Sequence, residues 1–345
     1  MTQARVRVII DNDFSGDPDG LVQLAHHVLS PSVDIRAIIG SHLRPGDPFD
    51  PSRTTAENAC RKAEEVLEAL GRAGELTVLA GSNVALFDAH TPIASPGALA
   101  IVAEALRDDT ELPLYVACGA GLTELASAWL LEPRIADRLT AIWIGGQEHP
   151  GLAVPPPNAD PIEYNLNIDV TAARVVFNDS TIPIWQVPRN AYRQALLSRA
   201  ELETRIRPHG AIGELLFRSI DAVERMAGEH GLPLGETYIY GDSPLVLLTA
   251  LQSAFQPDAS SSAYETRPVP RFGADGLPDF RAGGRDIRVY TRLDVRLMFE
   301  DLFAKLALLR RGRRRAGQPP ECRHRLELAL ITASNAVETT RRGPV

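Results

Sequence analysis

The most constraining feature of this chain is a short apolar run near its start that ends in a crowd of acidic side chains. Residues 6–10 are mostly β-branched, which predicts a buried strand. Glycine and proline then force the chain to turn, and the pattern LVQLAHHVL predicts a helix from residue 21. The turn carries four carboxylates: Asp11, Asp13, Asp17 and Asp19. Because open α/β sheets bind ligands where strands end and helices begin, this turn is the candidate site.

Like charges at this density repel one another unless they share a cation. Ligands that are all oxygen suit a hard cation, Ca²⁺ or Mg²⁺. A second interpretation is that Asp17 and Asp19 only cap the helix that follows. It does not account for Asp11 and Asp13, which come too early to cap that helix.

The rest of the chain alternates strand-like and helix-like patterns. Further strands are expected at residues 33–43, 75–81, 112–121, 139–146 and 181–187. Helices are expected at residues 52–72, 96–107, 123–133, 169–179, 192–206, 210–230, 241–251 and 294–309. This alternation predicts an open α/β fold, with a mostly parallel central sheet flanked by helices.

Two parts of the chain depart from that alternation. Residues 262–293 predict a small antiparallel appendage. We expect a single domain over residues 1–309, followed by a basic linker from residue 310 and a C-terminal tail to residue 345 that could contain a short helix.

Composition limits the classes of protein that this chain can belong to. A net charge of −8 argues against nucleic acid as the main partner. The three cysteines are far apart and lack CxxC spacing, so neither a disulfide framework nor a zinc site is expected. No signal peptide and no membrane span is recognised, which leads us to expect a cytoplasmic protein without a membrane partner.

Two later segments add candidate residues. Glu163 and Asn165 follow a proline-rich stretch at residues 147–162, and they offer a carboxylate and an amide to sugar hydroxyls. The alternative is that they lie in an exposed loop. Asp242 falls in the first turn of the helix expected at residues 241–251, where a carboxylate is ordinarily a helix cap.

In series, these motifs resemble the inosine–uridine preferring nucleoside hydrolase family. That family opens with a strand that ends in DxDxxxDD. Asp11, Asp13 and Asp17 match its first three acidic positions, Pro18 stands at the fourth, and Asp19 follows one residue later. The chain is therefore a divergent form, DNDFSGDPDG.

Later blocks of the chain are similar to the same family, and the resemblance covers roughly residues 1–305. They are LTELASAWLLEPRIADRLTAIWIGG (122–146), with Glu124 in place of Asn; EYNLNIDVTAARVVF (163–177); QVPRNAYRQALL (186–197); and YGDSPLVLL (240–248), with Gly241 in place of His.

The resemblance implies Ca²⁺-dependent cleavage of the N-glycosidic bond of ribonucleosides, by a metal-bound water that Asp13 activates. The implied Ca²⁺ ligands are Asp13, Asp19, Asp242 and the backbone carbonyl of Cys118. The implied substrate-binding residues are Asp17, Asn158, Glu163 and Asn165, with Ser41 and His42 as further candidates at the end of the second strand. Asp11 is expected to orient Asp13 from behind. The family also implies a nucleoside as the partner and a homo-oligomer, dimer or tetramer.

The group that protonates the departing base is left open, because Gly241 replaces the family histidine. His42, His149, Tyr238 and Tyr240 are substitutes by position in the sequence. Trp185 could stack on a base, but a core position is the better interpretation.

Two other functions remain as alternatives. One is a protein that keeps the scaffold and binds a sugar or nucleoside without turnover. The other is a haloacid-dehalogenase-type phosphatase, because DNDFS also resembles the DxDx motif of that class. Such phosphatases need a lysine at another strand end, whereas Lys62 and Lys305 both fall in helical patterns.

Overall fold

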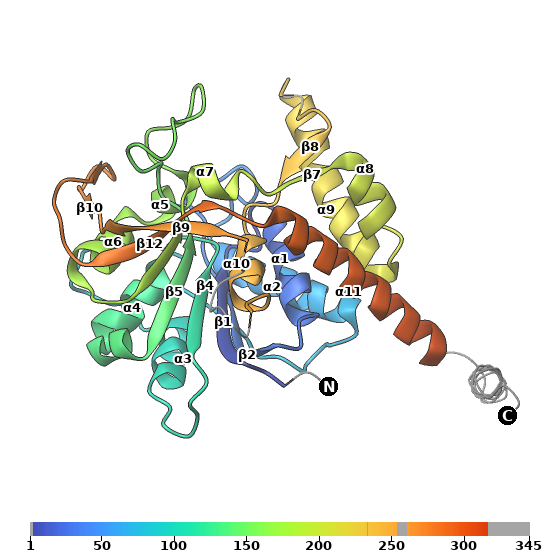
Figure 1. Ribbon diagram of the computed structural model, residues 1–345, viewed down its shortest axis with the longest axis horizontal. Helices are drawn as coiled ribbons and strands as arrows, with labels where there is room; N and C mark the ends of the chain where they lie inside the picture. The colour runs from blue at the N-terminus through green and yellow to red at the C-terminus, as the bar shows by residue number, and fades with distance from the viewer. Residues whose placement is uncertain (1–2, 233, 254–260, 317–345) are drawn as a thin grey trace, which may run out of the picture.

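The computed structural model describes residues 3–232, 234–253 and 261–316. An eight-stranded sheet runs through the middle of the molecule (Figure 1). In spatial order its strands are β3 (Val78–Ala80), β2 (Val33–Gly40), β1 (Val6–Asn12), β4 (Leu114–Cys118), β5 (Leu139–Ile144), β6 (Ile184–Val187), β12 (Asp286–Arg292) and β9 (Ala263–Pro268). Every neighbouring pair is parallel except β12 with β9, so the predicted mostly parallel sheet is confirmed.

Both faces of the sheet are buried, and successive side chains of β1 point alternately into two hydrophobic cores. Val8 and Ile10 belong to one core and Ile9 to the other, and all three are fully buried. The first core receives side chains from α1 (Asp19–Val28), α2 (Thr55–Leu70), α9 (Gly210–Glu229), α10 (Pro244–Thr249) and α11 (Val295–Ala316). The second receives them from α3 (Pro96–Ala105), α4 (Thr123–Leu131) and α6 (Val170–Arg174).

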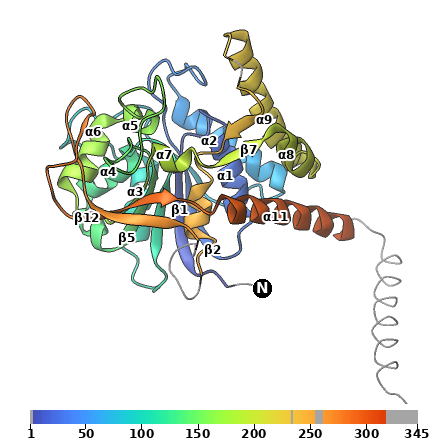
Figure 2. The ribbon, with the colours of Figure 1, turned by 45° about the horizontal axis from the view of Figure 1, so that its top comes forward.

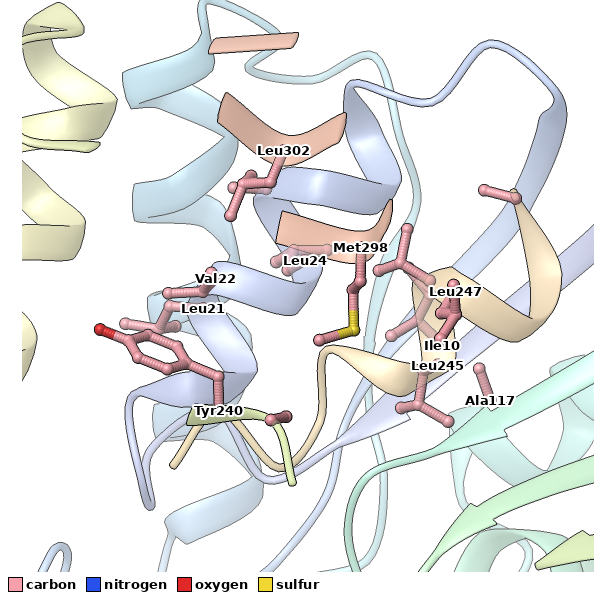
Figure 3. Close-up of a cluster of buried hydrophobic side chains, with 14 of the residues drawn as sticks. Ile10, Leu21, Val22, Leu24, Ala117, Tyr240, Leu245, Leu247, Met298 and Leu302 are labelled. Carbon is pink, nitrogen blue, oxygen red and sulfur yellow. The ribbon is translucent and has the colours of Figure 1, made fainter. Parts of the chain in front are cut away.

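The first core fixes the position of the acidic turn. Figure 3 shows Leu24 of α1 among Leu245 and Leu247 of α10 and Met298 of α11, all fully buried. Burying each such side chain contributes roughly 1.5–3 kcal/mol. Because these contacts hold α1 in place, Asp19 at its first residue stays beside the end of β1.

The remaining elements are short. They are the antiparallel pair β7 (Leu196–Ser198) and β8 (Thr237–Ile239), the pair β10 (Arg271–Phe272) and β11 (Pro278–Asp279), and the helices α5 (Tyr164–Ile168), α7 (Arg189–Tyr192) and α8 (Arg199–Glu201). A 3₁₀ turn, η1 (Pro133–Asp137), and two π-helical turns, η2 (Val175–Asp179) and η3 (Leu202–Ile206), complete them.

Two predicted helices differ from those observed. The helix expected at residues 192–206 is broken, because residues 196–198 pair with β8. The helix expected at residues 241–251 is confined to α10, which starts at Pro244, a residue suited to the first helical position. Asp242 therefore precedes that helix and does not lie in its first turn.

The C-terminal part also differs from expectation. The antiparallel pair predicted at residues 262–293 is present, but it extends the central sheet because β12 pairs with β6. The linker suggested from residue 310 is instead the end of α11, which runs through Ala316, with residues 310–312 exposed. Arginine is a good helix former, so the helix continues past its buried face. Figure 2 shows α11 projecting beyond the body. The tail predicted after residue 316 lies outside the described residues.

None of the helices in the described part of the chain is both long and apolar enough to cross a membrane.

Candidate active site

A cavity of about 220 Å³ opens where β1, β4 and β5 end. Helix α1 follows β1 onto one face of the sheet, whereas α4 follows β4 onto the other. Such a switch point between adjacent strands is where open α/β sheets bind ligands. The cavity is lined by Asp13, Asp17, Asp19, Phe49, Gly119, Ile144, Glu163, Tyr164, Asn165, Tyr192, Ile239, Gly241 and Asp242.

The structure thus brings together five carboxylates that the sequence singled out. Asp13, Asp19, Asp242 and Glu163 are buried, and Asp17 is partly buried. No lysine, arginine or histidine lines the cavity within the described residues. The negative charge of the cavity is therefore not offset by side chains of the cavity wall.

Burial and mutual repulsion both act on these carboxyl groups. Burial raises the pKa of Asp13, and the charges of Asp242 and Asp17 raise it further. The pKa of Asp19 is raised by the same two causes. Burial also raises the pKa of Asp17 to about 6 and that of Asp242 to about 7. Each group would release its proton more readily if a cation were present.

Two hydrogen bonds hold Asp242 beside the end of β1. Asn12 Nδ2 donates to Asp242 Oδ2 at 2.9 Å, and the backbone N–H of Asp242 donates to Asp19 Oδ2 at 2.9 Å. Gly119 is required for this approach, because a Cβ there would lie 2.4 Å from Asn12 Nδ2. These contacts join β1, β4 and the start of α10 into one site.

The helix-cap interpretation applies to one of these carboxylates. Asp17 Oδ1 accepts from the backbone N–H of Asp19 at 3.3 Å, at the start of α1. Asp19 and Asp242 are not the N-cap residues of α1 and α10. Those residues are Pro18 and Ser243, and neither makes a side-chain cap hydrogen bond. The carboxylates of Asp19 and Asp242 face the cavity instead.

The donor set suits a hard cation. The cavity offers carboxylate oxygens without a basic partner, and Asp13 Oδ2 is buried with no hydrogen-bond partner. In the described residues, however, no three His, Cys, Asp or Glu side chains are already arranged as metal ligands. One carboxylate oxygen of Asp19 already accepts a hydrogen bond from the Asp242 backbone, and one of Asp242 accepts from Asn12. The chemistry therefore fits a cation, although its ligands are not preassembled.

The opposite wall of the cavity is built on the start of α5. Glu163 Oε2 accepts from the backbone N–H groups of Gly146 at 2.8 Å and Leu166 at 3.1 Å. Asn165 Nδ2 donates to the carbonyl of Ile144 at 2.8 Å. These bonds hold both side chains in the wall, so the exposed-loop alternative for Glu163 and Asn165 is wrong.

Three tyrosines surround the cavity, and each donates its hydroxyl to a carboxylate. Tyr164 donates to Asp47 at 2.8 Å, Tyr192 to Glu163 at 3.0 Å, and Tyr238 to Asp17 at 2.7 Å. Burial raises the pKa of all three tyrosines, so they remain protonated donors. Sequence reasoning missed Asp47 and Tyr192 as site residues, because each reaches its partner only through the tertiary fold.

Several predicted site residues lie outside the cavity lining. Asn158 is exposed in the proline-rich loop, with φ of 60°. His42 is buried, with Nε2 2.9 Å from the Thr123 hydroxyl. Cys118 ends β4 and does not line the cavity, whereas the next residue, Gly119, does.

Asp11 lies deeper in the protein than the cavity. It accepts a hydrogen bond from the Ser41 hydroxyl. Burial raises its pKa, and the charge of Glu124 raises it further. Ser41 therefore contacts Asp11 in the interior and does not line the cavity.

Of the other candidates for leaving-group acid, Tyr238 lies beside the cavity with its hydroxyl bonded to Asp17, whereas His149 and Tyr240 are placed elsewhere. His149 Nε2 lies 2.8 Å from Gln186 Oε1 and lines a separate cavity. Tyr240 is buried and packs against Phe299. Trp185 packs between Tyr115 and Tyr290, which confirms it as a core residue.

Comparison with known proteins decides the family. The family model described as inosine-uridine preferring nucleoside hydrolase matches residues 8–267. The chain belongs to this family. The resemblance stated from its motifs is therefore confirmed.

Individual relatives agree with this assignment. The chain is 40% identical over 92 residues to the inosine-uridine preferring nucleoside hydrolase of Leishmania major, which is 26% of this chain and 27% of the relative. It is 45% identical over 68 residues to the protein of the same name from Crithidia fasciculata, 19% of each chain. These matches span about a quarter or less of the length of the curated relatives.

A solved structure extends the likeness over the fold. The purine-preferring ribonucleoside hydrolase from Gardnerella vaginalis superposes with a TM-score of 0.66 at 17% identity, over 88% of this chain and 99% of that one. The nucleoside hydrolase family also removes the phosphatase alternative. Lys62 pairs with Glu65 and Lys305 with Asp301, and neither lysine lines the acidic cavity.

Proposed function

We propose that this chain hydrolyses the N-glycosidic bond of ribonucleosides with Ca²⁺ as its cofactor, releasing the base and ribose. The observation that carries the proposal is the acidic cavity, in which five carboxylates without a basic partner meet at the switch point of a nucleoside hydrolase fold. Uncompensated buried charge of this kind is costly, and it is retained where a function uses it.

Asp13, Asp19 and Asp242 would hold the cation. The backbone carbonyl of Cys118, the residue directly before Gly119 of the cavity lining, would be a further ligand only if it turned toward the cavity. Ca²⁺ bound there would offset the repulsion among them and make an attacking water more acidic. Asp13 would act as the general base for the attacking water, since its Oδ2 is buried without a hydrogen-bond partner in the protein. Asp11 would support this end of β1 from the interior, through its bond with Ser41.

The sugar would lie against Asp17, Glu163 and Asn165. Their fixed oxygens and amide can hold ribose hydroxyls while positive charge develops on the ring. Tyr192 and Tyr238 keep Glu163 and Asp17 oriented through their hydroxyl bonds. A contact from Asn158 requires the loop at residues 147–162 to close over the sugar. We assign Ser41 and His42 no direct contact.

The second candidate function is nucleoside binding without turnover, and Gly241 favours it. A Cβ at Gly241 would lie 3.2 Å from the Tyr192 ring, so this ring occupies the space beside the position of the family histidine. No histidine lines the acidic cavity in the described residues. A binding protein would need no group to protonate the departing base.

A substrate panel separates the two functions. Purine, pyrimidine and nicotinamide ribosides are incubated with the protein, and free base and reducing sugar are measured with and without a chelator. Release that stops with the chelator and returns with added Ca²⁺ supports the hydrolase. Saturable binding of the same ribosides without release would support the binding protein instead.

A further inference from the structure

A second, larger cavity adjoins the acidic one. Its volume is about 650 Å³, against about 220 Å³ for the acidic cavity. The two share Asp17, Phe49 and Ile239. The two cavities therefore adjoin at these three residues.

The wall of the second cavity is mostly apolar. It is formed by Pro48, Phe49, Leu196, Val223, Met226, Ala227, Leu232, Leu234 and Ile239, with Asp17, His230, Thr237 and Tyr238 as its polar members. Two of the polar groups already have partners, because Tyr238 donates to Asp17 and His230 Nδ1 contacts the Met226 carbonyl. The cavity therefore presents few polar groups that could bind a ligand.

Three leucines of this wall are exposed to solvent. Leu196, Leu232 and Leu234 are 48%, 65% and 40% exposed. They come from β7 and from the segment between α9 and β8. Apolar side chains gathered around one cavity indicate that an apolar group covers them in the functional state.

We propose that this cavity is the aglycone subsite, and that the chain acts on nucleosides whose base carries a bulky apolar substituent. This inference rests on the proposed function. The acidic cavity accepts the ribose, so the glycosidic bond would cross the shared boundary and the base would lie against Phe49, whose ring can stack on it. The substituent then fills the space beside Val223, Met226 and Ala227 on α9.

The size and polarity of the cavity support an apolar substituent. A volume of about 650 Å³ falls in the range of roughly 300–1,000 Å³ that is typical of pockets for small organic molecules. The polar edge of an unsubstituted base would lose water here and gain few hydrogen bonds. An apolar substituent makes no hydrogen bonds to water that it would lose on entering the cavity. A single methylene in an apolar pocket changes specificity about 10–200-fold.

The first test compares two substrates that share the sugar and the purine. kcat/KM is measured for adenosine and N6-benzyladenosine, and we expect at least a tenfold preference for the benzyl compound. Ala227→Phe fills the cavity from α9, and it should lower kcat/KM for N6-benzyladenosine at least tenfold more than for adenosine. Ala211→Phe is the matched control, because Ala211 lies on the same helix, is exposed and lines no cavity described above. Both rates should be unchanged in that control.

A second variant tests the same cavity at another position, so that the result does not rest on Ala227→Phe alone. Leu234 is exposed, so Leu234→Asp should fold, and it should also reduce the preference for N6-benzyladenosine. Equal kcat/KM for the two nucleosides in the unmodified protein would overturn the inference while leaving the proposed function intact. A lack of turnover on every riboside would reject the proposed function, and the aglycone subsite with it. A dimer that Leu234→Asp dissociates, without any substrate preference, would show that a second copy covers these leucines and would also overturn the inference.

Discussion

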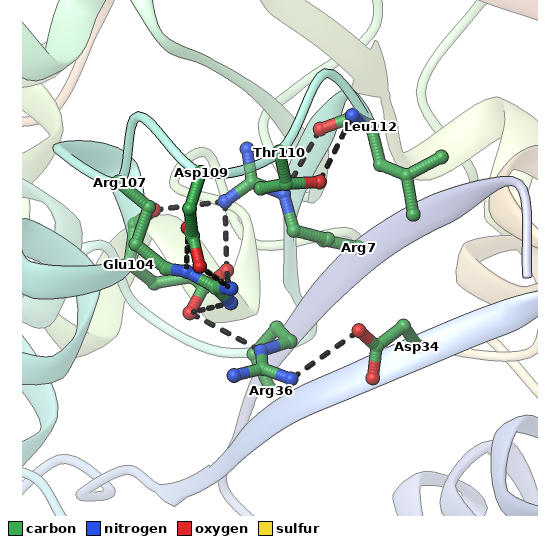
Figure 4. A network of polar contacts seen from close by, with 8 residues as sticks. All are labelled: Arg7, Asp34, Arg36, Glu104, Arg107, Asp109, Thr110 and Leu112. Carbon is green, nitrogen blue, oxygen red and sulfur yellow. Dashed lines mark hydrogen bonds and ion pairs between the residues drawn. The ribbon is translucent and has the colours of Figure 1, made fainter.

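The two ends of β1 hold buried charge in opposite ways. At the amino end, Arg7 Nη1 donates to Glu104 Oε1 at 2.7 Å, and Arg36 and Arg107 also pair with Glu104 (Figure 4). Burial raises the pKa of Glu104, but the hydrogen bonds from Arg7 and Arg36 hold it below its usual value. At the carboxyl end, Asp13, Asp19 and Asp242 have no basic partner among the described residues that line the cavity, and their pKa values are raised.

The contrast separates a structural ion cluster from a functional one. Removing either partner of a fully compensated buried ion pair lowers the stability of the folded protein. A buried cluster of charges of one sign already lowers that stability, so removing one member relieves repulsion. An added cation or proton therefore stabilises the acidic end of β1, whereas the charges at the amino end are already balanced.

The largest expected effect is on turnover at the acidic end. Asp13→Ala removes a base and a proposed metal ligand together, so kcat should fall by at least the ~10²–10⁴ typical of general base catalysis. The free energy of unfolding should change little, because the lost group was uncompensated. Release of reducing sugar and denaturant unfolding measure the two effects.

Asp108→Ala serves as the control, because Asp108 is exposed and lies between α3 and β4, before the amino end of β4. It should leave both kcat and stability unchanged. If Asp13→Ala keeps near-normal activity, the proposed mechanism is wrong.

The next largest effect is on stability at the amino end. Glu104→Gln leaves the Arg7 guanidinium buried without its carboxylate, which should lower the free energy of unfolding by about 3–5 kcal/mol. Chemical denaturation measures this loss. An equally large loss in Asp13→Ala would remove the distinction between the two ends of β1.

A smaller effect is expected from pH when Ca²⁺ is removed. The folded protein keeps a proton on Asp242 up to about pH 7, because burial raises its pKa, whereas the unfolded chain releases that proton near 3.8. Stability should therefore fall as pH rises from 5 through 7, by about 3 kcal/mol at ~1.4 kcal/mol per pH unit.

Thermal or denaturant unfolding at pH 5 and pH 8, with chelator and with Ca²⁺, tests this dependence. Ca²⁺ should restore stability at pH 8. Asp242→Asn in chelator should show a weaker dependence on pH, and an unchanged dependence would exclude Asp242 as its source.

No effect on turnover is expected from the C-terminus. Among the described residues, those that line the acidic cavity all precede residue 243, and the side chains of α11 known to be buried precede residue 310. Stopping the chain after Gly312 should leave turnover per folded subunit unchanged, although its oligomeric state can shift. A truncated protein that is folded and loaded with Ca²⁺, yet inactive, would contradict this expectation.

Much of the fold could be predicted because its signals are local. Apolar strands that end in small residues, each followed by an amphipathic helix, were enough to predict the parallel sheet and its flanking helices. Prediction failed where pairing between distant segments overrode local pattern. Residues 196–198 pair with β8 across a long connection, and β12 joins β6 from a hundred residues away.

The sequence by itself determined that Asp13, Asp17 and Asp19 lie close together in one turn, because they follow the same strand within a few residues of one another. The tertiary structure alone decided what surrounds them. It brought Asp242 to Asn12 and Tyr238 to Asp17 across more than 200 residues, and it left Asn158 exposed. The physical reason is that hydrogen bonds and burial depend on positions in space, which the packing of α1, α10 and the sheet fixes and no local spacing encodes.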